Sequence, residues 1–308
     1  EQVFLGLKSA LFTGFSQSLL HGVTGSGKTF IYLKLILEVL AQKKSILFLV
    51  PEINLTPQFL AEFIKYVPCP VLAYHSSISN SEKYAIWKRA SDPDAEPFLL
   101  VGVRSASFVP FVDLGLIILD EEHDGSFKQD DRCPYHARDV LTMIAKEKNI
   151  PILFGSATPA VETYYRFTQK MKENYYVLSK RAVSGSFLPT IKILDMQNET
   201  EDSPLWPITP AIIDSINHEV SIGNQVLVFI NRLGYSHYMQ CLSCRHQFFC
   251  PNCSVGLKYY KKKNELHCQI CSYSQQAPAI CPSCGSLKFT HRGFGTEKVM
   301  ESLRVASP

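Results

Sequence analysis

A glycine-rich run near the start of the chain has the residues needed to hold a phosphate group. Residues 21–29 read His-Gly-Val-Thr-Gly-Ser-Gly-Lys-Thr and contain the phosphate-binding-loop (P-loop) pattern G-x-x-x-x-G-K-T. Glycines let the backbone approach phosphates without Cβ clashes, while the lysine reaches the β- and γ-phosphates and the threonine binds Mg²⁺. The pattern predicts a nucleotide site at Gly22, Thr24, Gly25, Ser26, Gly27, Lys28 and Thr29. A glycine-rich turn before a helix is the alternative.

An acidic run later in the chain could complete that site. Residues 116–119 are continuously apolar and are followed by Asp120, Glu121, Glu122 and His123. An acid at the carboxyl end of a buried strand suits nucleotide-bound Mg²⁺, and a second carboxylate can orient the attacking water. We therefore expect Asp120 to bind Mg²⁺ and Glu121 to position water. An acidic turn after a strand is the alternative, but the P-loop pattern favours a nucleoside triphosphatase.

Cysteines supply a second kind of chemistry. The chain has ten, and eight of them form four C-x-x-C pairs between residues 241 and 284. Each pair can give two thiolates to a tetrahedral Zn²⁺, and four pairs can be joined in three ways. The gap between the second and third pairs has the length of a zinc-ribbon hairpin, which leaves the first and fourth pairs for an outer site. Cys69 and Cys133 are predicted to be ordinary thiols.

The segments around the P-loop predict the elements that position it. Residues 18–20 are apolar before the loop, and residues 30–37 are apolar at helical spacing after it. Strand, loop and helix in this order aim backbone N–H groups at phosphate. Further strands are predicted at 46–50, 71–74, 98–101, 116–119 and 152–154, and helices near 3–11, at 80–91 and at 136–148. This alternation predicts an α/β fold with a parallel sheet covered on both faces.

Proline and glycine loosen the pattern between about residues 180 and 207, which indicates a domain boundary. Beyond it, residues 211–220 predict a helix, and residues 225–230 predict a buried strand that opens a second α/β lobe. A glycine turn at 293–295 leads to another amphipathic helix. We expect a first lobe at 1–183, a linker at 184–208, a zinc-binding insertion at 237–289, and a truncated second lobe at 209–236 and 290–308.

Three segments have compositions that fit more than one role. Small hydroxyl residues at 155–159 could link the nucleotide site to a neighbouring lobe or cap a helix starting near Pro159. Residues 125–138 are loop-like and interleave aromatic with basic residues, which suits single-stranded DNA or an ordinary surface loop. The run 258–263, Lys-Tyr-Tyr-Lys-Lys-Lys, could touch phosphate or form a solvated hairpin tip.

Composition sets broad limits. Hydrophobic residues make up 46% of the 308 residues, enough for sizeable cores, and the length suggests about two domains. The net charge of +3 does not by itself indicate nucleic-acid binding, which would need a local patch. No apolar run approaches the length of a transmembrane helix, and no signal peptide is visible, so no membrane association is expected.

Taken together, the motifs resemble the helicase core of the bacterial primosomal protein N′ family, replication-restart DNA helicases of superfamily 2. The resemblance spans nearly the whole chain. The motifs that carry it, in family order, are Gly22–Thr29, Val50–Thr56, Gly102–Ala106, Asp120–His123, Gly155–Pro159, the aromatic-rich stretch Asp120–Asp139, Asn231–Tyr235 and the eight paired cysteines.

The resemblance implies roles for particular residues. It implies two RecA-like lobes, with Lys28, Asp120 and Glu121 as catalytic residues and Gln2 in a truncated adenine-reading element. It implies two Zn²⁺, one held by Cys241, Cys244, Cys281 and Cys284 and the other by Cys250, Cys253, Cys268 and Cys271. DNA contacts are expected at Arg104, Phe127, Lys128, Tyr135 and Arg138.

The resemblance also implies a biology: ATP-dependent 3′→5′ unwinding in restart of stalled forks. The expected partners are single-stranded and forked DNA, primosome proteins and single-stranded-DNA-binding protein. A monomer in the bacterial cytoplasm, associated with the nucleoid, is expected. The family's N-terminal DNA-binding regions and late second-lobe motifs are missing here, so we expect a fragment that binds nucleotide weakly and hydrolyses it poorly. A double-stranded DNA translocase and a zinc-ribbon scaffold that only senses nucleotide are the alternatives.

Overall fold

The computed structural model describes residues 1–10, 13–131, 133–183, 189–194, 208–230, 238–261, 263–292 and 296–306. The contacts divide the chain into two compact units, Glu1–Thr190 and Ile191–Pro308. Three sequence predictions fall on other residues: most of the predicted linker 184–208, the motif 231–235 and the glycine turn 293–295 lie outside the described residues.

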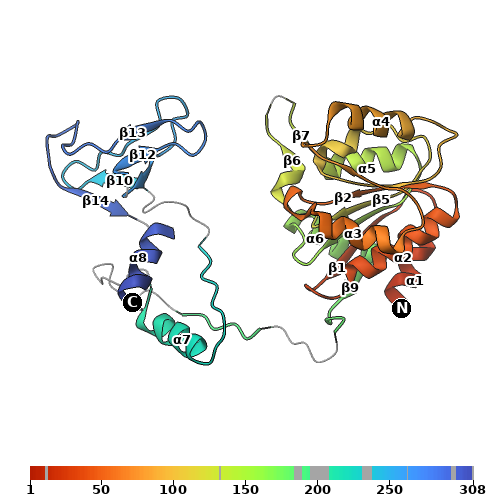
Figure 1. Ribbon diagram of the computed structural model, residues 1–308, viewed down its shortest axis with the longest axis horizontal. Helices are drawn as coiled ribbons and strands as arrows, with labels where there is room; N and C mark the ends of the chain where they lie inside the picture. The colour runs from red at the N-terminus through yellow and green to blue at the C-terminus, as the bar shows by residue number, and fades with distance from the viewer. Residues whose placement is uncertain are drawn as a thin grey trace. The chain divides into compact units, whose positions relative to one another are not determined.

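A seven-stranded parallel sheet forms the centre of the first unit (Figure 1). Its strand order is β3-β4-β2-β5-β8-β1-β9. The strands are β1 Gln17–Gly22, β2 Ser45–Leu49, β3 Val71–Tyr74, β4 Leu99–Gly102, β5 Leu114–Asp120, β8 Ile152–Ser156 and β9 Tyr175–Leu178. All strands predicted for this half are confirmed. The edge strand β9, which pairs with β1, was not predicted.

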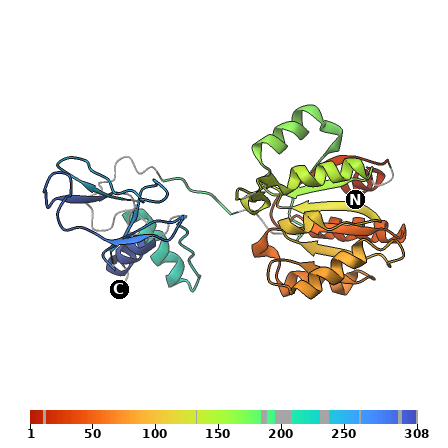
Figure 2. The same cartoon turned by 90° about the horizontal axis from the view of Figure 1, so that it is seen from above.

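Apolar side chains along the central strands face both ways, which explains why helices cover both sides of the sheet (Figure 2). In β2, for example, Ile46 and Phe48 belong to one buried cluster and Leu47 and Leu49 to the other. The helices α1 Gln2–Ala10, α2 Lys28–Ala41 and α3 Pro57–Tyr66 add to the first cluster, and α4 Asn80–Ala90 and α5 Ala137–Glu147 to the second. The predicted α/β fold is therefore confirmed. None of the described helices is long and apolar enough to span a membrane.

N-terminal capping residues fix where several of these helices begin. Thr56 accepts a hydrogen bond from the Phe59 N–H across the first turn of α3, and Pro57 occupies its first position. Ser79 and Glu82 form a capping box at the start of α4. The helix predicted to start near Pro159 begins at Val161: α6 covers Val161–Tyr165 and continues as a π-helical turn, Arg166–Lys170.

The second unit combines two helices with small antiparallel sheets. α7 Pro210–Ser221 confirms the predicted helix, and it packs against α8 Thr296–Ala306 through Ile213 and Val299. Between these helices, β10 Tyr238–Cys241 pairs with β14 Phe289–Arg292. A three-stranded sheet contains β11 Lys258–Tyr260, β12 Glu265–His267 and β13 Ser274–Gln276. A small apolar core supports both sheets, with Met239, Phe248, Leu257 and Leu266 buried.

The strand predicted at residues 225–230 is wrong. These residues form no strand, and Leu227 and Phe229 are 90% and 77% exposed. A strand needs a neighbour to receive its backbone hydrogen bonds, and no other described segment pairs with this one. The apolar run alone therefore indicated burial that the described part of the chain does not provide.

Candidate nucleotide-binding site and cysteine clusters

The P-loop joins the carboxyl end of β1 to the amino-terminal end of α2. Gly25 and Gly27 have positive φ angles of 75° and 87°, a conformation that glycine adopts without strain. Gly27 is the N-cap of α2, so Lys28 and Thr29 open the helix. A Cβ atom at Gly22 would lie 2.5 Å from the Ser26 Oγ. The loop is thus compact, with the backbone N–H groups of a helix start exposed to a potential anion.

Two polar groups of this loop fit a bound phosphate. The Ser26 Oγ is buried without a hydrogen-bond partner. The Lys28 Nζ donates a hydrogen bond to the Gly22 carbonyl over 3.0 Å, and its nearest carboxylate oxygen, in Glu121, is 3.7 Å away. An unsatisfied hydroxyl, and a lysine whose only anionic partner in the described residues is a long 3.7 Å ion pair with Glu121, are groups that a phosphate would satisfy.

Asp120 ends β5 beside this loop, as predicted for a Mg²⁺ ligand. Its Oδ1 accepts a hydrogen bond from the Tyr32 hydroxyl over 2.8 Å. Burial raises the pKa of the Asp120 carboxyl to about 6, although the Tyr32 hydrogen bond and the Lys28 charge oppose that rise. A divalent cation would favour the ionised form of this buried carboxyl, so the donor chemistry fits Mg²⁺.

Glu121 stands where the chain turns away from the sheet. Its φ angle is 50°, an uncommon conformation for a residue other than glycine. Its carboxylate lies 3.7 Å from the Lys28 Nζ and 3.6 Å from the His123 Nδ1. The side chain is 27% exposed, so water can reach it. This placement suits the predicted water-positioning role.

Glu122 has a structural role that the sequence did not indicate. It is fully buried, and its carboxylate accepts hydrogen bonds from the Ala160 N–H, the Thr163 hydroxyl and the Arg138 guanidinium. Arg138 was predicted to contact DNA, but its side chain is only 18% exposed and is held in this internal ion pair. Arg138 therefore has a structural role, because a buried carboxylate needs its charge compensated. Its contact with DNA stays a prediction.

The segment 155–159 contacts the acidic run directly. The Ser156 Oγ lies 2.8 Å from the His123 Nδ1, and the Thr158 Oγ1 lies 3.3 Å from the His123 Nε2. The expectation that a serine or threonine caps the following helix is wrong: the N-cap of α6 is Ala160, without a side-chain cap. The Glu122 carboxylate accepts the Ala160 N–H instead.

Gly155 is required for close packing at this site. A Cβ atom there would lie 1.7 Å from the Tyr32 hydroxyl oxygen and 2.8 Å from the Tyr32 Cζ. We therefore expect Gly155→Ala to lower the free energy of unfolding by about 1–3 kcal/mol, the range for overpacked interiors. Gly125→Ala is the matched control, because no atom lies within 4 Å of a Cβ at that position. Chemical denaturation of both variants measures the difference, and equal stabilities would contradict the packing argument.

The aromatic-rich segment forms a short hairpin where the sequence predicted a loop. β6 Lys128–Gln129 pairs with β7 Tyr135–His136. Phe127, predicted to contact DNA, is fully buried in the core of the first unit. Its ring cannot stack on a base, so this prediction is wrong. Composition alone could not distinguish an aromatic side chain of the core from an exposed one that can stack on a base.

Four other side chains form what we name the aromatic–basic patch: Arg104, Phe108, Lys128 and Tyr135. The Phe108 and Tyr135 rings meet edge to face at 5.0 Å, and the Arg104 guanidinium lies 6.0 Å from the Tyr135 ring centre. Arg104 also donates a hydrogen bond to the Lys128 carbonyl. Phe108 is 58% exposed and was missed by the sequence analysis, although it lies beside the motif that contains Arg104.

Gln2 lies near the start of α1, beside a cavity of about 380 Å³. Phe4, Phe30, Lys34 and Leu178 also line this cavity, which adjoins α2 and the end of β9. An adenine ring prefers such an apolar slot with a few polar groups. The location is compatible with the role predicted for Gln2, which stays a prediction.

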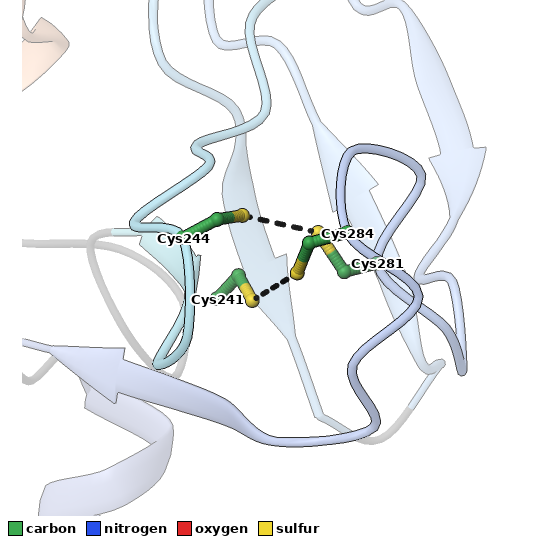
Figure 3. A group of neighbouring side chains, drawn as sticks. All are labelled: Cys241, Cys244, Cys281 and Cys284. Carbon is green, nitrogen blue, oxygen red and sulfur yellow. Dashed lines mark hydrogen bonds between the residues drawn. The ribbon is translucent and has the colours of Figure 1, made fainter.

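The eight paired cysteines form two clusters in the second unit. One contains Cys241, Cys244, Cys281 and Cys284, and the other contains Cys250, Cys253, Cys268 and Cys271. Within each cluster all sulfur atoms lie within 4.8 Å of one another. Figure 3 shows the first cluster, in which the Cys241–Cys284 and Cys244–Cys281 sulfur pairs are each 3.6 Å apart. The grouping is the nested one expected from the sequence.

These distances fit zinc better than disulfides. A disulfide would require a sulfur separation of about 2 Å. Four thiolates around a tetrahedral Zn²⁺, with bonds of about 2.3 Å, would be separated by roughly 3.8 Å. In the second cluster the Cys250 and Cys271 sulfurs are 3.5 Å apart. Both clusters are therefore close to the size that a zinc ion requires.

The backbone around each pair explains how these clusters form. The residue after the second cysteine of every pair has a positive φ angle, and these residues are Arg245, Ser254, Ser272 and Gly285. Backbone N–H groups lower the pKa of two thiols to about 6: the Cys244 N–H acts on Cys241, and the Tyr273 N–H acts on Cys271. The hydrogen bond with Cys271 raises the pKa of Cys253 to about 12. Each cluster thus has a thiol predisposed to ionise, as metal binding requires.

Comparison with known families agrees with this architecture. Residues 7–167 match the DEAD/DEAH box helicase family, and residues 250–276 match the PriA DNA helicase Cys-rich region (CRR) domain. The first match spans more than half of the chain and includes the P-loop and the acidic run. The chain therefore belongs to the DEAD/DEAH box helicase family.

The chain is also similar to curated proteins of one kind, the replication restart proteins PriA. The chain is 38% identical to Replication restart protein PriA of Bacillus subtilis over 94% of its length, covering 36% of that protein. It is 39% identical to the Synechocystis PriA over 96% of its length, and 40% identical to the Chlamydia trachomatis PriA over 96%. The matched region covers 36% of the length of the Synechocystis protein and 39% of the length of the Chlamydia trachomatis protein. The chain therefore spans less than half the length of each of these three relatives.

Solved structures of helicases show a more distant similarity. The structure of RecG bound to a three-way DNA junction has a TM-score of 0.46, at 18% identity over 72% of this chain and 28% of that one. The Pyrococcus furiosus Hef helicase domain has a TM-score of 0.40, at 19% identity over 57% of this chain and 37% of that one.

Proposed function

We propose that this chain forms the motor part of an ATP-dependent 3′→5′ DNA helicase that acts in restart of stalled replication forks and primosome assembly. The observation that carries the proposal is the meeting of Lys28, Asp120 and Glu121 at one edge of the sheet. The similarity to Replication restart protein PriA supports a role in replication restart. The direction of movement and a bacterial cytoplasmic, nucleoid-associated location are part of the proposal through the family resemblance of the sequence motifs.

Each residue of the proposed site has a distinct task. Lys28 and the N–H groups at the start of α2 hold the β- and γ-phosphates. Thr29 and Asp120 hold Mg²⁺, which when bound neutralises charge on the phosphates. Glu121 orients the attacking water and accepts its proton. Gln2 reads the adenine ring from the cavity beside α2.

The aromatic–basic patch is the proposed DNA-binding surface, and a short segment of chain connects it to the nucleotide site. The exposed Phe108 ring and the half-buried Tyr135 ring suit stacking against unpaired bases, and Arg104 and Lys128 suit phosphates. Only a few residues separate Glu121 from Lys128, and this short segment also contains the buried Phe127. Movement of Glu121 on nucleotide binding would therefore reach the patch through a short, anchored segment. Single-stranded and forked DNA are the proposed substrates.

The two cysteine clusters are proposed to hold two Zn²⁺ ions, one in each cluster. The metal would keep the small sheets of the second unit folded, so that they can engage DNA or primosome proteins and single-stranded-DNA-binding protein. The domain limits proposed from the sequence, with the insertion at 237–289 between parts of a second lobe, and a monomeric state belong to the same proposal.

ATP hydrolysis by the full-length protein, with and without forked DNA, tests this function. We expect DNA to raise the rate, and we expect Lys28→Ala to remove both the basal rate and the stimulation. A wild-type rate that does not respond to DNA would contradict the helicase proposal. It would favour instead a zinc-ribbon scaffold whose P-loop senses nucleotide, for which Lys28→Ala would leave DNA and partner binding intact. Strand-separation assays on forked and on blunt DNA distinguish the two motor classes, because a helicase separates the strands whereas a double-stranded DNA translocase moves without separating them.

A further inference from the structure

Tyr32 contacts the predicted Mg²⁺ ligand without belonging to any motif identified in the sequence. Its side chain is fully buried, and its hydroxyl donates a hydrogen bond to the Asp120 Oδ1 over 2.8 Å. Tyr32 lies one helical turn after Lys28 in α2, so both residues occupy the same face of the helix. The Tyr32 ring also packs edge to face against Phe48 of β2, with ring centres 5.5 Å apart. Its orientation is therefore constrained by the core.

Space for the Tyr32 hydroxyl comes from a residue on a neighbouring strand. Gly155 of β8 pairs with Asp120 of β5 in the sheet. A Cβ atom at Gly155 would lie 1.7 Å from the Tyr32 hydroxyl oxygen and 3.1 Å from the Asp120 Oδ1. No side chain other than hydrogen would leave this hydrogen bond in place. The contact thus depends on α2, β5 and β8 together.

We propose that Tyr32 is a positioning residue for the cation-binding carboxylate, and that its hydroxyl holds Asp120 in the orientation that binds nucleotide-bound Mg²⁺. The proposal rests on the proposed nucleotide function of the site. One rigid helix would then hold the phosphates through Lys28 and Thr29 and orient the metal ligand through Tyr32. Partners that orient a metal ligand in this way typically change metal affinity strongly when removed.

A purely structural role makes a different prediction. If the hydroxyl only satisfied a buried carboxylate, its removal would lower stability but leave the affinity for a divalent cation unchanged. The substitution Tyr32→Phe separates these roles, because it removes one oxygen and keeps the ring against Phe48. Tyr176→Phe is the matched control: Tyr176 packs against the same hydrophobic cluster from β9, away from Asp120.

The test uses Mn²⁺ as a probe for the Mg²⁺ site, measured by electron paramagnetic resonance on the full-length protein with ADP. We expect Tyr32→Phe to weaken Mn²⁺ binding by about tenfold. Tyr176→Phe should match the wild type, and ADP binding in EDTA should be the same in all three proteins. Mn²⁺ affinity equal to the wild type in Tyr32→Phe would overturn the inference while leaving the proposed nucleotide function intact. Failure of the wild type to bind ADP would overturn both.

A second variant tests the same contact without altering Tyr32. Gly155→Ala places a methyl group where the hydroxyl lies, so Asp120 should lose this hydrogen bond. We expect its Mn²⁺ affinity to fall in the same direction as that of Tyr32→Phe, in protein that circular dichroism shows to be folded. Wild-type Mn²⁺ affinity in folded Gly155→Ala would contradict the inference.

Discussion

Glu121→Gln is expected to slow ATP hydrolysis about 10²–10⁴-fold while leaving ATP and DNA binding near wild-type values. The glutamine keeps the shape and the hydrogen-bonding capacity of the side chain but cannot accept a proton from the attacking water. Glu121 is partly exposed and lies near Lys28, so the substitution buries no new polar group. Single-turnover hydrolysis with labelled ATP, beside equilibrium binding of a fluorescent nucleotide and of single-stranded DNA, measures the separation.

Two other glutamates serve as controls for this prediction. Glu147→Gln, at the exposed end of α5, should leave both rate and stability unchanged. Glu122→Gln should instead destabilise the fold by about 3–5 kcal/mol, because it removes the charge that the partly buried Arg138 faces. Hydrolysis at the wild-type rate in folded Glu121→Gln would contradict the assigned role. Equal stabilities of Glu122→Gln and the wild type would contradict the buried ion pair.

The sequence predicted the site best where local pattern and topology agree. Apolar runs such as 116–119 can only be covered by helices on both faces, and the carboxyl ends of parallel strands meet at one edge of the sheet. That combination brought Lys28 and Asp120 together in the prediction. The cysteine grouping followed from spacing, because a short hairpin joins the second and third pairs. In both cases the chemistry depends on residues whose relative positions are set by regular structure.

Predictions based on composition alone were less successful. Phe127 and Arg138 occur in a segment rich in aromatic and basic residues, but one is core and the other neutralises Glu122. The apolar run 225–230 looks like a buried strand, yet strand formation depends on partners that are distant in sequence. Tyr32 gave no signal because helical apolar spacing explains it, and its contact with Asp120 depends on how α2 packs on β5.

Removal of zinc is expected to unfold residues 238–292 of the second unit while the first unit stays folded. The core of this region consists of a few side chains such as Phe248, Leu257 and Leu266, too few to stabilise sheets of two and three short strands alone. Structural Zn²⁺ contributes about 10–16 kcal/mol in small zinc-finger peptides, which is more than such a core supplies. The first unit has its own sheet and two hydrophobic clusters, so it does not depend on the metal.

Hydrogen–deuterium exchange with and without a chelator measures this difference region by region. Protection should be lost between residues 238 and 292 and kept in strands β2 and β5.

Cys250→Ser and Cys241→Ser each disable one cluster and should each reduce the bound zinc from two ions to one, as counted by elemental analysis. Cys133→Ser is the matched control, because Cys133 is exposed and outside both clusters. Protection that survives complete zinc removal would contradict the prediction that the metal stabilises this region.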